Sequence, residues 1–96
     1  SLYKSHFSDV NGVKIFEEPH HCKSNYWLQT IILSKESVEE RDKILKRTND
    51  AGISTRPAWN LLHTLPPYRS NPRGYTPVSE KLLSSIINLP SSAGLA

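Results

Sequence analysis

The apolar and polar positions in the first third of the chain predict a short helix and two strands. Residues 1–12 are typical of a short helix that ends in a turn. Apolar and charged side chains alternate after this turn, which predicts a strand over residues 13–19 that Pro19 ends. Residues 25–33, NYWLQTIIL, are rich in aromatic and β-branched side chains and are largely apolar on both faces. They therefore predict a central, covered strand.

The clearest helix in the pattern covers residues 37–51. Ser37 and Glu40 match a capping box, and Gly52 stands where glycine commonly ends a helix. The face predicted to meet the core consists of Val38, Ile44, Leu45, Thr48 and Ala51. The solvated face carries opposite charges four residues apart, in the order that stabilises a helix: Glu39–Lys43 and Asp42–Lys46.

The last part of the chain predicts an edge strand, a long loop and a second helix. Residues 53–59 follow the first helix directly, and Pro57, which has no N–H to donate, restricts this strand to the edge of a sheet. Thr76 and Pro77 are typical of the start of a helix. The apolar stripe of this helix is Val78, Leu82, Leu83 and Ile86. The helix ends at NLP, residues 88–90, where another strand can begin.

This order of elements predicts one small domain. The chain has 96 residues, which is the length of a single domain. Strands and helices with short connections bury their apolar faces best as a small, mainly antiparallel sheet with helices packed on one side. The predicted fold class is therefore α+β.

Composition and charge limit the classes of partner and the cellular compartments that fit this chain. The formal net charge is +3, but the lysines and arginines are scattered and many stand beside acidic residues. Nucleic-acid-binding domains usually carry denser basic clusters, which argues against nucleic acid as a partner. Cys22 is the only cysteine, which excludes an internal disulfide and favours a reducing cytoplasm. No stretch approaches the ~20 apolar residues of a membrane-spanning helix.

The segment TRPAWNLLHTLPPYRSNPRGYTP, residues 55–77, combines arginines, aromatic rings and prolines without an acidic residue. Guanidinium groups suit phosphate oxygens, flat rings suit a base or a sugar, and prolines favour a fixed path. The residues concerned are Arg56, Arg69, Arg73, Trp59, Tyr68, Tyr75 and His63. Two interpretations stay open at this point. The loop faces an anionic ligand, or its aromatic side chains pin it to its own domain while the arginines are solvated.

The other chemically suggestive residues have simpler explanations. The run HHC at residues 20–22 lacks a second pair at metal-ligand spacing, so a turn is favoured over a metal or thiol site. Asn25 and Tyr26 open the central strand, where a turn and core packing explain them. Residues 17–18, two glutamates, have no further carboxylate at catalytic spacing. The residues alone therefore indicate no catalytic constellation and no metal site.

Several stretches taken together resemble one known family. They are SNYWLQTIIL, the helix after it, GISTRPAWNLLHTLPPY and VSEKLLSSIINLPSS, in this order from about Phe16 to Ser92. The order is similar to the C-terminal small domain of the pyridoxal-phosphate-dependent sugar aminotransferases, the DegT/StrS family of fold type I. The motifs NYWL and TRPAW most resemble the branch that acts on UDP-linked 4-keto-6-deoxy amino sugars.

The resemblance implies that residues 1–96 form one wall of an active site in a larger enzyme. Family members transfer an amino group, usually from glutamate, to a keto nucleotide sugar for amino-sugar and surface-polysaccharide synthesis. A large domain of the same polypeptide carries the Schiff-base lysine and most contacts to pyridoxal 5'-phosphate, and the whole enzyme is expected to be a homodimer. None of the lysines of this chain stands at the matching position: Lys4, Lys14, Lys23, Lys35, Lys43, Lys46 and Lys81. The isolated chain is therefore expected to be inactive.

The resemblance also implies substrate-binding residues. In many relatives the segment after G-I-x-T carries a His-Tyr pair and then a P-L-H histidine near the substrate. Trp59 stands at the tyrosine and His63 at the second histidine, whereas Ala58 replaces the first histidine. Arg56 suits a phosphate or the carboxylate of the amino donor. Together with two residues that open the central strand, the expected set is Asn25, Tyr26, Arg56, Trp59 and His63.

A second interpretation comes from the basic, aromatic loop alone. A free-standing interaction domain would bind nucleic acid or an acidic partner through its arginines and rings. Binding to DNA or RNA of this kind weakens steeply with added salt, which distinguishes it from the aminotransferase interpretation.

Overall fold

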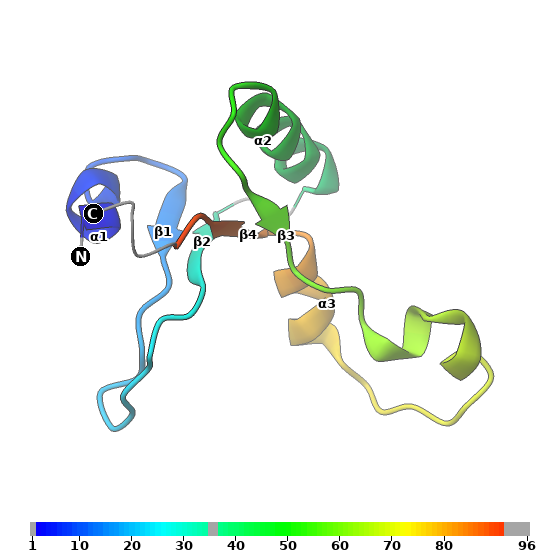
Figure 1. The fold of residues 1–96 in the computed structure, drawn as a ribbon. Coiled ribbons are helices and arrows are strands. Elements are labelled where there is room, and N and C mark those ends of the chain that lie inside the picture. Colours follow the sequence, from blue (N-terminus) through cyan, green and yellow to red (C-terminus); the bar gives the residue numbers. More distant parts are fainter. Residues whose placement is uncertain (1, 35–36, 92–96) are drawn as a thin grey trace.

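Residues 2–34 and 37–91, which the computed structural model describes, form a four-stranded sheet with helices around it (Figure 1). In chain order the elements are α1 (Leu2–Phe7), β1 (Val13–Ile15), β2 (Gln29–Leu33), α2 (Val38–Asp50), β3 (Arg56–Pro57), two 3-10 turns (Leu62–Thr64 and Pro66–Tyr68), α3 (Pro77–Leu83) and β4 (Ile86–Leu89). The strands follow the order β1-β2-β4-β3, and each neighbouring pair is antiparallel. The last strand of the chain therefore lies inside the sheet, between β2 and β3.

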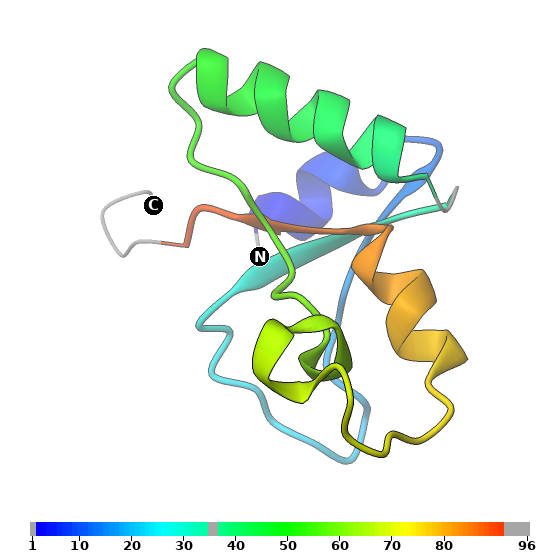
Figure 2. The ribbon, with the colours of Figure 1, turned by 90° about the vertical axis from the view of Figure 1, so that its right-hand side faces the viewer.

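The core lies on one face of this sheet. The register places Ile31 of β2 opposite Ile15 of β1 on one side and Ile87 of β4 on the other. Phe7 of α1 and Leu45 of α2 pack against this cluster, so both helices cover the same face. In Figures 1 and 2, α3 lies on the other side of the sheet from α2. The predicted α+β class with an antiparallel sheet is confirmed, and α1 and α2 are the helices that share one side.

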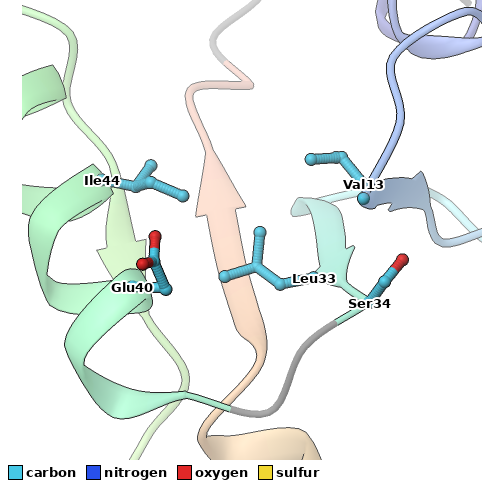
Figure 3. A pocket seen from close by; sticks show the side chains of 6 residues that line it. Val13, Leu33, Ser34, Glu40 and Ile44 are labelled. Carbon is cyan, nitrogen blue, oxygen red and sulfur yellow. The ribbon is translucent and has the colours of Figure 1, made fainter.

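An apolar hollow remains on the covered face beside α2. Figure 3 shows Ile44 and Glu40 of α2 on one side of it, and Leu33 of β2 and Val13 of β1 on the other. Its volume is about 390 Å³. α2 packs on β3 and β4. The described residues therefore leave a space between α2 and the other two strands, β1 and β2.

The two ends of α2 form as the sequence predicts. The Ser37 Oγ accepts a hydrogen bond from the Glu40 N–H at 3.3 Å, which is one half of the predicted capping box. At the other end Gly52 has φ 84°, and the Ile53 N–H donates to the Thr48 carbonyl at 2.8 Å. This is a Schellman motif, in which a glycine in the left-handed region ends a helix. The prediction for Gly52 is confirmed.

The inward face of α2 is shorter than predicted. Ile44 and Leu45 pack on the core as predicted, but Val38 is 51% exposed and Ala51 is also exposed. The half-buried Arg41 takes part in this face instead, because its Nη1 donates at 2.7 Å to the carbonyl of the last residue of α3. The predicted burial of Val38 and Ala51 is therefore wrong.

The predicted ion pairs of α2 are wrong as well. Lys46 pairs with Asp50 at 2.9 Å, and Asp42 pairs with Arg41 at 3.0 Å, instead of with each other. Within the described residues no ion pair joins Glu39 to Lys43. Surface pairs contribute about 0–1 kcal/mol each, so this exchange of partners changes helix stability little.

The strand predicted over residues 25–33 is shorter because its first part is a turn. β2 begins at Gln29. The Asn25 Oδ1 accepts from the Trp27 N–H at 3.1 Å, and Tyr26 has φ 48°. Asparagine side chains compete for nearby backbone N–H groups and favour turns. The central position of the strand is confirmed, but its predicted coverage is wrong at Trp27, which is 69% exposed.

The first and third strands are also shorter than predicted. β1 ends at Ile15 instead of at Pro19, although the Phe16 N–H still donates to the carbonyl of Thr30 at 2.9 Å. β3 comprises two residues and pairs with β4 at the edge of the sheet. The edge position that Pro57 predicts is therefore confirmed.

The second helix ends earlier than predicted. α3 covers Pro77–Leu83, and Ile86 belongs to β4. The β-branched pair that opens β4 favours a strand, and its partners in β2 make that strand an inner one. Thr76 stands at the N-cap position as predicted, but its side chain makes no capping hydrogen bond. Val78 is 67% exposed, so its predicted place in a buried stripe is wrong.

Substituting Gly52 by alanine is expected to lower the free energy of unfolding by about 1–2 kcal/mol, because a Cβ disfavours the left-handed region. Gly74 is the matched control, since its φ lies outside that region and no atom stands within 4 Å of an added Cβ. Gly74→Ala should leave stability unchanged or raise it by up to about 1 kcal/mol. Urea unfolding followed by circular dichroism measures both variants, and equal losses would contradict the helix-ending role of Gly52.

Candidate functional site

The predicted substrate-binding residues lie on two connecting segments of the chain or directly next to them. Residues 16–28 connect β1 to β2, and residues 58–76 connect β3 to α3. In Figures 1 and 2 both segments extend from the side of the sheet opposite α2. The residues predicted on or next to them are Asn25, Tyr26, Arg56, Trp59 and His63. The structure distributes four of them among three separate hollows and leaves Asn25 outside all three.

Arg56 and Trp59 share an open hollow of about 630 Å³ at the edge of the sheet. Its other lining residues are Pro57, Ala58, Asn60 and Leu65. Trp59 is 83% exposed, so its indole is accessible to a ligand. A guanidinium next to a flat ring suits a ligand that joins an anionic group to a sugar or a base. The structure thus brings two of the predicted residues together.

The end of α2 holds the Arg56 side chain. The Arg56 Nη1 donates to the Asn49 Oδ1 at 2.9 Å and to the Thr55 carbonyl at 2.9 Å. The Asn49 Nδ2 in turn donates to the Thr55 Oγ1 at 3.0 Å. Thr55 is 1% exposed, so an exposed guanidinium is anchored on a buried polar group.

The hydrophobic pattern does not predict Asn49 as a site residue. The available signal is the polar pair Thr48-Asn49 in the last turn of α2, followed by Thr55 after the helix ends. Polar side chains at helix ends usually bond nearby backbone groups. Here the Thr48 Oγ1 also lies 2.5 Å from the Thr55 Oγ1, so the pair connects the helix to the edge strand.

His63 lines a second hollow of about 370 Å³, next to α3. Its Nε2 lies 3.9 Å from the Glu80 Oε1, and the Arg73 Nη2 lies 3.4 Å from the same oxygen. The Thr76 Oγ1, from a further lining residue, is buried and has no hydrogen-bond partner among the described residues. Glu80 therefore ties Arg73 of the 58–76 segment to α3, and His63 lies beside the same carboxylate. His63 does not line the hollow that contains Arg56.

Tyr26 lines a third hollow, of about 200 Å³, together with Lys4 and Glu17. Its φ of 48° is one that a non-glycine residue adopts at a cost of about 1–3 kcal/mol, and such strain concentrates at binding sites. The Tyr26 hydroxyl accepts from the Glu18 N–H at 3.1 Å, which fixes the ring over the segment. Asn25 is exposed, and its Oδ1 is occupied by the turn. The geometry therefore favours Tyr26 over Asn25 as a ligand contact.

An ion pair forms one wall of the hollow beside Tyr26. The Lys4 Nζ lies 2.6 Å from the Glu17 Oε1. This hydrogen bond and the attraction between the charges lower the pKa of the Glu17 carboxyl and raise the pKa of the Lys4 ammonium. Because the pKa of Glu17 is lowered, the pair stabilises the fold above the ordinary pKa of a glutamate. This contribution is lost as the pH falls through the lowered pKa.

Substituting Lys4 by glutamine is expected to raise the pKa of the Glu17 carboxyl toward its ordinary value, because the charged donor is removed. The measurement is the carboxyl carbon chemical shift of Glu17 during an acid titration. Lys43→Gln, on an exposed position of α2, serves as the control and should leave this pKa unchanged. A similar shift in both variants would contradict the pairing.

The two arginines within the 58–76 segment, Arg69 and Arg73, contact different parts of the chain. The Arg69 Nε donates to the Thr64 carbonyl at 3.1 Å, and Arg73 contacts Glu80, as described above. Trp59 and Tyr75 are 83% and 88% exposed, so these two rings do not pin the loop to the described part of the chain. Of the two interpretations left open by the sequence, these observations favour a loop that presents its rings to a partner or ligand.

Residues 2–34 and 37–91 contain neither a cluster that could hold a metal ion nor a helix that could cross a membrane. In this part of the chain no three His, Cys, Asp or Glu side chains lie close enough together to hold a metal ion. The rings of His20 and His21 meet edge to face with centroids 5.1 Å apart, and Cys22 is exposed. None of the helices found there has the length and apolar character to pass through a bilayer.

Comparison with known proteins finds relatives over the whole chain. The sequence profile of the DegT/DnrJ/EryC1/StrS aminotransferase family matches residues 1–96. The chain is 30% identical to a GDP-perosamine synthase of Escherichia coli O157:H7 over 95 residues, which are 99% of this chain and 25% of that protein. It is also 30% identical over 95 residues to a GDP-perosamine synthase of Vibrio cholerae, covering 98% of this chain and 26% of that protein.

A solved structure shares the fold. DesI, whose crystal structure was analysed in the presence of its TDP-sugar product, matches with a TM-score of 0.84 at 24% identity over 98% of this chain. The match covers 24% of the DesI chain. At this identity the likeness concerns the fold alone. The chain spans about a quarter of the length of these relatives.

Proposed function

Because the chain belongs to the DegT/DnrJ/EryC1/StrS aminotransferase family, we propose that it is the C-terminal small domain of a pyridoxal-phosphate-dependent enzyme that aminates a keto nucleotide sugar. The whole protein then serves the synthesis of amino sugars for surface polysaccharides or glycans. Residues 1–96 contribute part of the wall that binds the substrate. The observation that carries this proposal is the hollow shared by Arg56 and Trp59, whose lining includes both a cation and an aromatic ring.

The chemistry of this hollow suits both substrates of such an enzyme. The Arg56 guanidinium matches two oxygens of a phosphate, or of the carboxylate of an amino-acid donor. The Trp59 ring matches the face of a sugar or a base. The relatives that are 30% identical are GDP-perosamine synthases, and the UDP-linked sugar implied by the motifs NYWL and TRPAW belongs to the same substrate class. Tyr26 and His63 are proposed as further substrate contacts at the edges of this wall, with Asn25 in the turn beside Tyr26.

Pyridoxal 5'-phosphate supplies the amino-transfer chemistry when it is bound, and of the described lysines only Lys4 lines one of the four hollows. A lysine that attaches this cofactor must lose its proton to act as a nucleophile. Lys4 lines a hollow, yet Glu17 raises the pKa of its ammonium, which favours the protonated form. Lys35 lies outside the described residues. We therefore assign the cofactor to the large domain of the same polypeptide.

Exposed apolar side chains support a partner for this domain. Those on or next to the two projecting segments are Phe16, Trp27, Leu28, Trp59, Leu62, Tyr68, Tyr75 and Val78. Exposed apolar surface that is contiguous commonly marks an interface. We assign these side chains to contacts with the large domain and with the second copy in a homodimer. The enzyme is placed in the cytoplasm, where the exposed thiol of Cys22 stays reduced.

The test is an amino-transfer assay on the full-length protein. Purified protein is incubated with glutamate and a GDP-, TDP- or UDP-linked keto sugar, and the nucleotide sugars are analysed by mass spectrometry. We expect one of them to exchange its keto oxygen for an amine, with 2-oxoglutarate formed in equal amount. A folded, cofactor-loaded protein that aminates none of the three classes would contradict the proposal.

A further inference from the structure

The amide of Asn49, in the last turn of α2, has one orientation that satisfies its neighbours. Its Nδ2 donates to the Leu45 carbonyl at 2.7 Å, to the Thr55 carbonyl at 3.1 Å and to the Thr55 Oγ1 at 3.0 Å. A flipped amide would turn its oxygen toward two carbonyl oxygens and its N–H groups toward a guanidinium, which has no acceptor. The Asn49 Oδ1 is therefore fixed as the acceptor that faces Arg56.

The helix end that carries Asn49 is itself held in place. The Thr48 Oγ1 donates to the Ile44 carbonyl at 2.7 Å and lies 2.5 Å from the Thr55 Oγ1. Each hydroxyl has one proton. Thr55 therefore donates its proton to Thr48 and accepts from Asn49, which gives a continuous chain of hydrogen bonds. Because Thr55 is 1% exposed, water competes little for these bonds.

These contacts occupy one end of the guanidinium and leave one edge open. The Arg56 Nη1 donates to the Asn49 Oδ1 and to the Thr55 carbonyl, each at 2.9 Å. In the described part of the chain, neither the Nε nor the Nη2 of Arg56 makes a hydrogen bond. Nε and Nη2 point in the same direction and form the edge of the fork that grips two oxygens of a carboxylate or a phosphate.

We propose that Asn49 is a positioning residue, which holds Arg56 so that its Nε–Nη2 edge is free to bind a two-oxygen anion of the substrates. The anion is the carboxylate of the amino-acid donor or a phosphate of the nucleotide sugar, so the assignment rests on the proposed function. An arginine that is held before the ligand arrives loses less side-chain entropy on binding. Removal of Asn49 therefore weakens binding although Asn49 itself touches no ligand.

Steady-state kinetics of the full-length protein test this assignment with Asn49→Ala, Arg56→Ala and the double variant. Arg56→Ala should raise the KM of one substrate by about tenfold to hundredfold. Asn49→Ala should raise the KM of the same substrate by about three- to tenfold, with kcat unchanged. The KM of the double variant should equal the KM of Arg56→Ala, because Asn49 then has no guanidinium to position. A change in the KM of the amino donor identifies a carboxylate, and a change for the nucleotide sugar identifies a phosphate.

Gly52→Ala is the matched control for loosening of the helix end. It strains the C-terminal end of α2 without changing a side chain of the hydrogen-bond chain and leaves both partners of Arg56 in place. It should lower the melting temperature, as Asn49→Ala does, but leave KM unchanged. Equal KM increases in the two variants would overturn the assignment. A crystal structure of Asn49→Ala with Arg56 in its original orientation would overturn it too, independently of activity.

Failure of the proposed function gives a different result from failure of this assignment. If Arg56→Ala changes the KM of neither substrate, Arg56 is not part of the substrate wall, and both proposals fail at this residue. If Arg56→Ala raises a KM but Asn49→Ala does not, the positioning role is wrong and the substrate wall remains supported.

Discussion

Replacing Ile87 by alanine is expected to lower the free energy of unfolding by about 2–5 kcal/mol, because it opens a cavity where the structure cannot collapse. Ile87 is 0% exposed and pairs with Ile31 of β2 and Pro57 of β3, so it stands at the middle of the sheet. Native-state hydrogen exchange of the backbone amides of β2 and β4 measures the loss locally, even within a longer protein.

Ile53 provides the matched control for this substitution. It follows Gly52, is 49% exposed, and loses the same atoms when it is replaced by alanine. Ile53→Ala should cost less than about 1 kcal/mol, because a half-exposed side chain contributes little burial and leaves no cavity. Equal protection of the β4 amides in the two variants would contradict the position of β4 inside the sheet.

Replacing Arg56 by alanine should raise the KM of one substrate by about tenfold to hundredfold, since a hydrogen bond to a charged group contributes about 1.5–3 kcal/mol. Its effect on folding should be small, because the guanidinium is exposed and solvent replaces it at the Asn49 and Thr55 oxygens once it is removed. KM values for the amino donor and the nucleotide sugar, measured in the full-length protein beside its melting temperature, separate binding from stability.

Arg47 is the control for a general effect of charge. It lies in the last turn of α2 and is exposed, and its side chain makes no hydrogen bond or ion pair among the described residues. Arg47→Ala removes the same charge near the same helix end and should leave both KM values unchanged. If the two variants weaken binding to the same extent, the effect is a long-range one and Arg56 makes no direct contact.

Local signals in the sequence predict the elements whose causes are local. Ser37 and Gly52 mark the two ends of α2. The hydrogen bonds that form each end join residues only a few positions apart in the chain. Pro57 marks an edge strand because a missing N–H has the same consequence in any sheet. The family was predictable from several motifs in a fixed order, although each motif alone is weak. These parts of the prediction depend on no contact between distant residues.

The misplaced boundaries have non-local causes. Apolar residues at Leu82, Leu83 and Ile86 fit a helical stripe, and Ile86 and Ile87 fit a strand equally well. The choice is made by pairing of β4 with β2, more than fifty positions earlier in the chain, as in the contact between Asn88 and Thr30. In the same way, Tyr26 and Trp27 have strand-like side chains, but the side chain of Asn25 bonds the backbone and forms a turn.

The sequence indicates which residue types form the site, but it does not indicate how their side chains are arranged in space. Arg56 and Trp59 line the same hollow because they are three positions apart at the end of one strand. His63 turns toward Glu80 of α3, and Tyr26 belongs to a different segment, so neither shares the hollow of Arg56. The hydrophobic pattern does not predict Asn49 as a site residue, because its role depends on how the end of α2 lies against β3.

The most direct measurement is a crystal structure of the full-length protein with its nucleotide sugar and the cofactor bound. The predicted result is a substrate oxygen within about 2.7–3.2 Å of the Arg56 Nε or Nη2, with Trp59 against the sugar or the base. The Asn49 Oδ1 should keep its bond to the Arg56 Nη1. A substrate bound in the cofactor site without contact to Arg56, Trp59, Tyr26 or His63 would contradict the role of this domain as a wall of the active site.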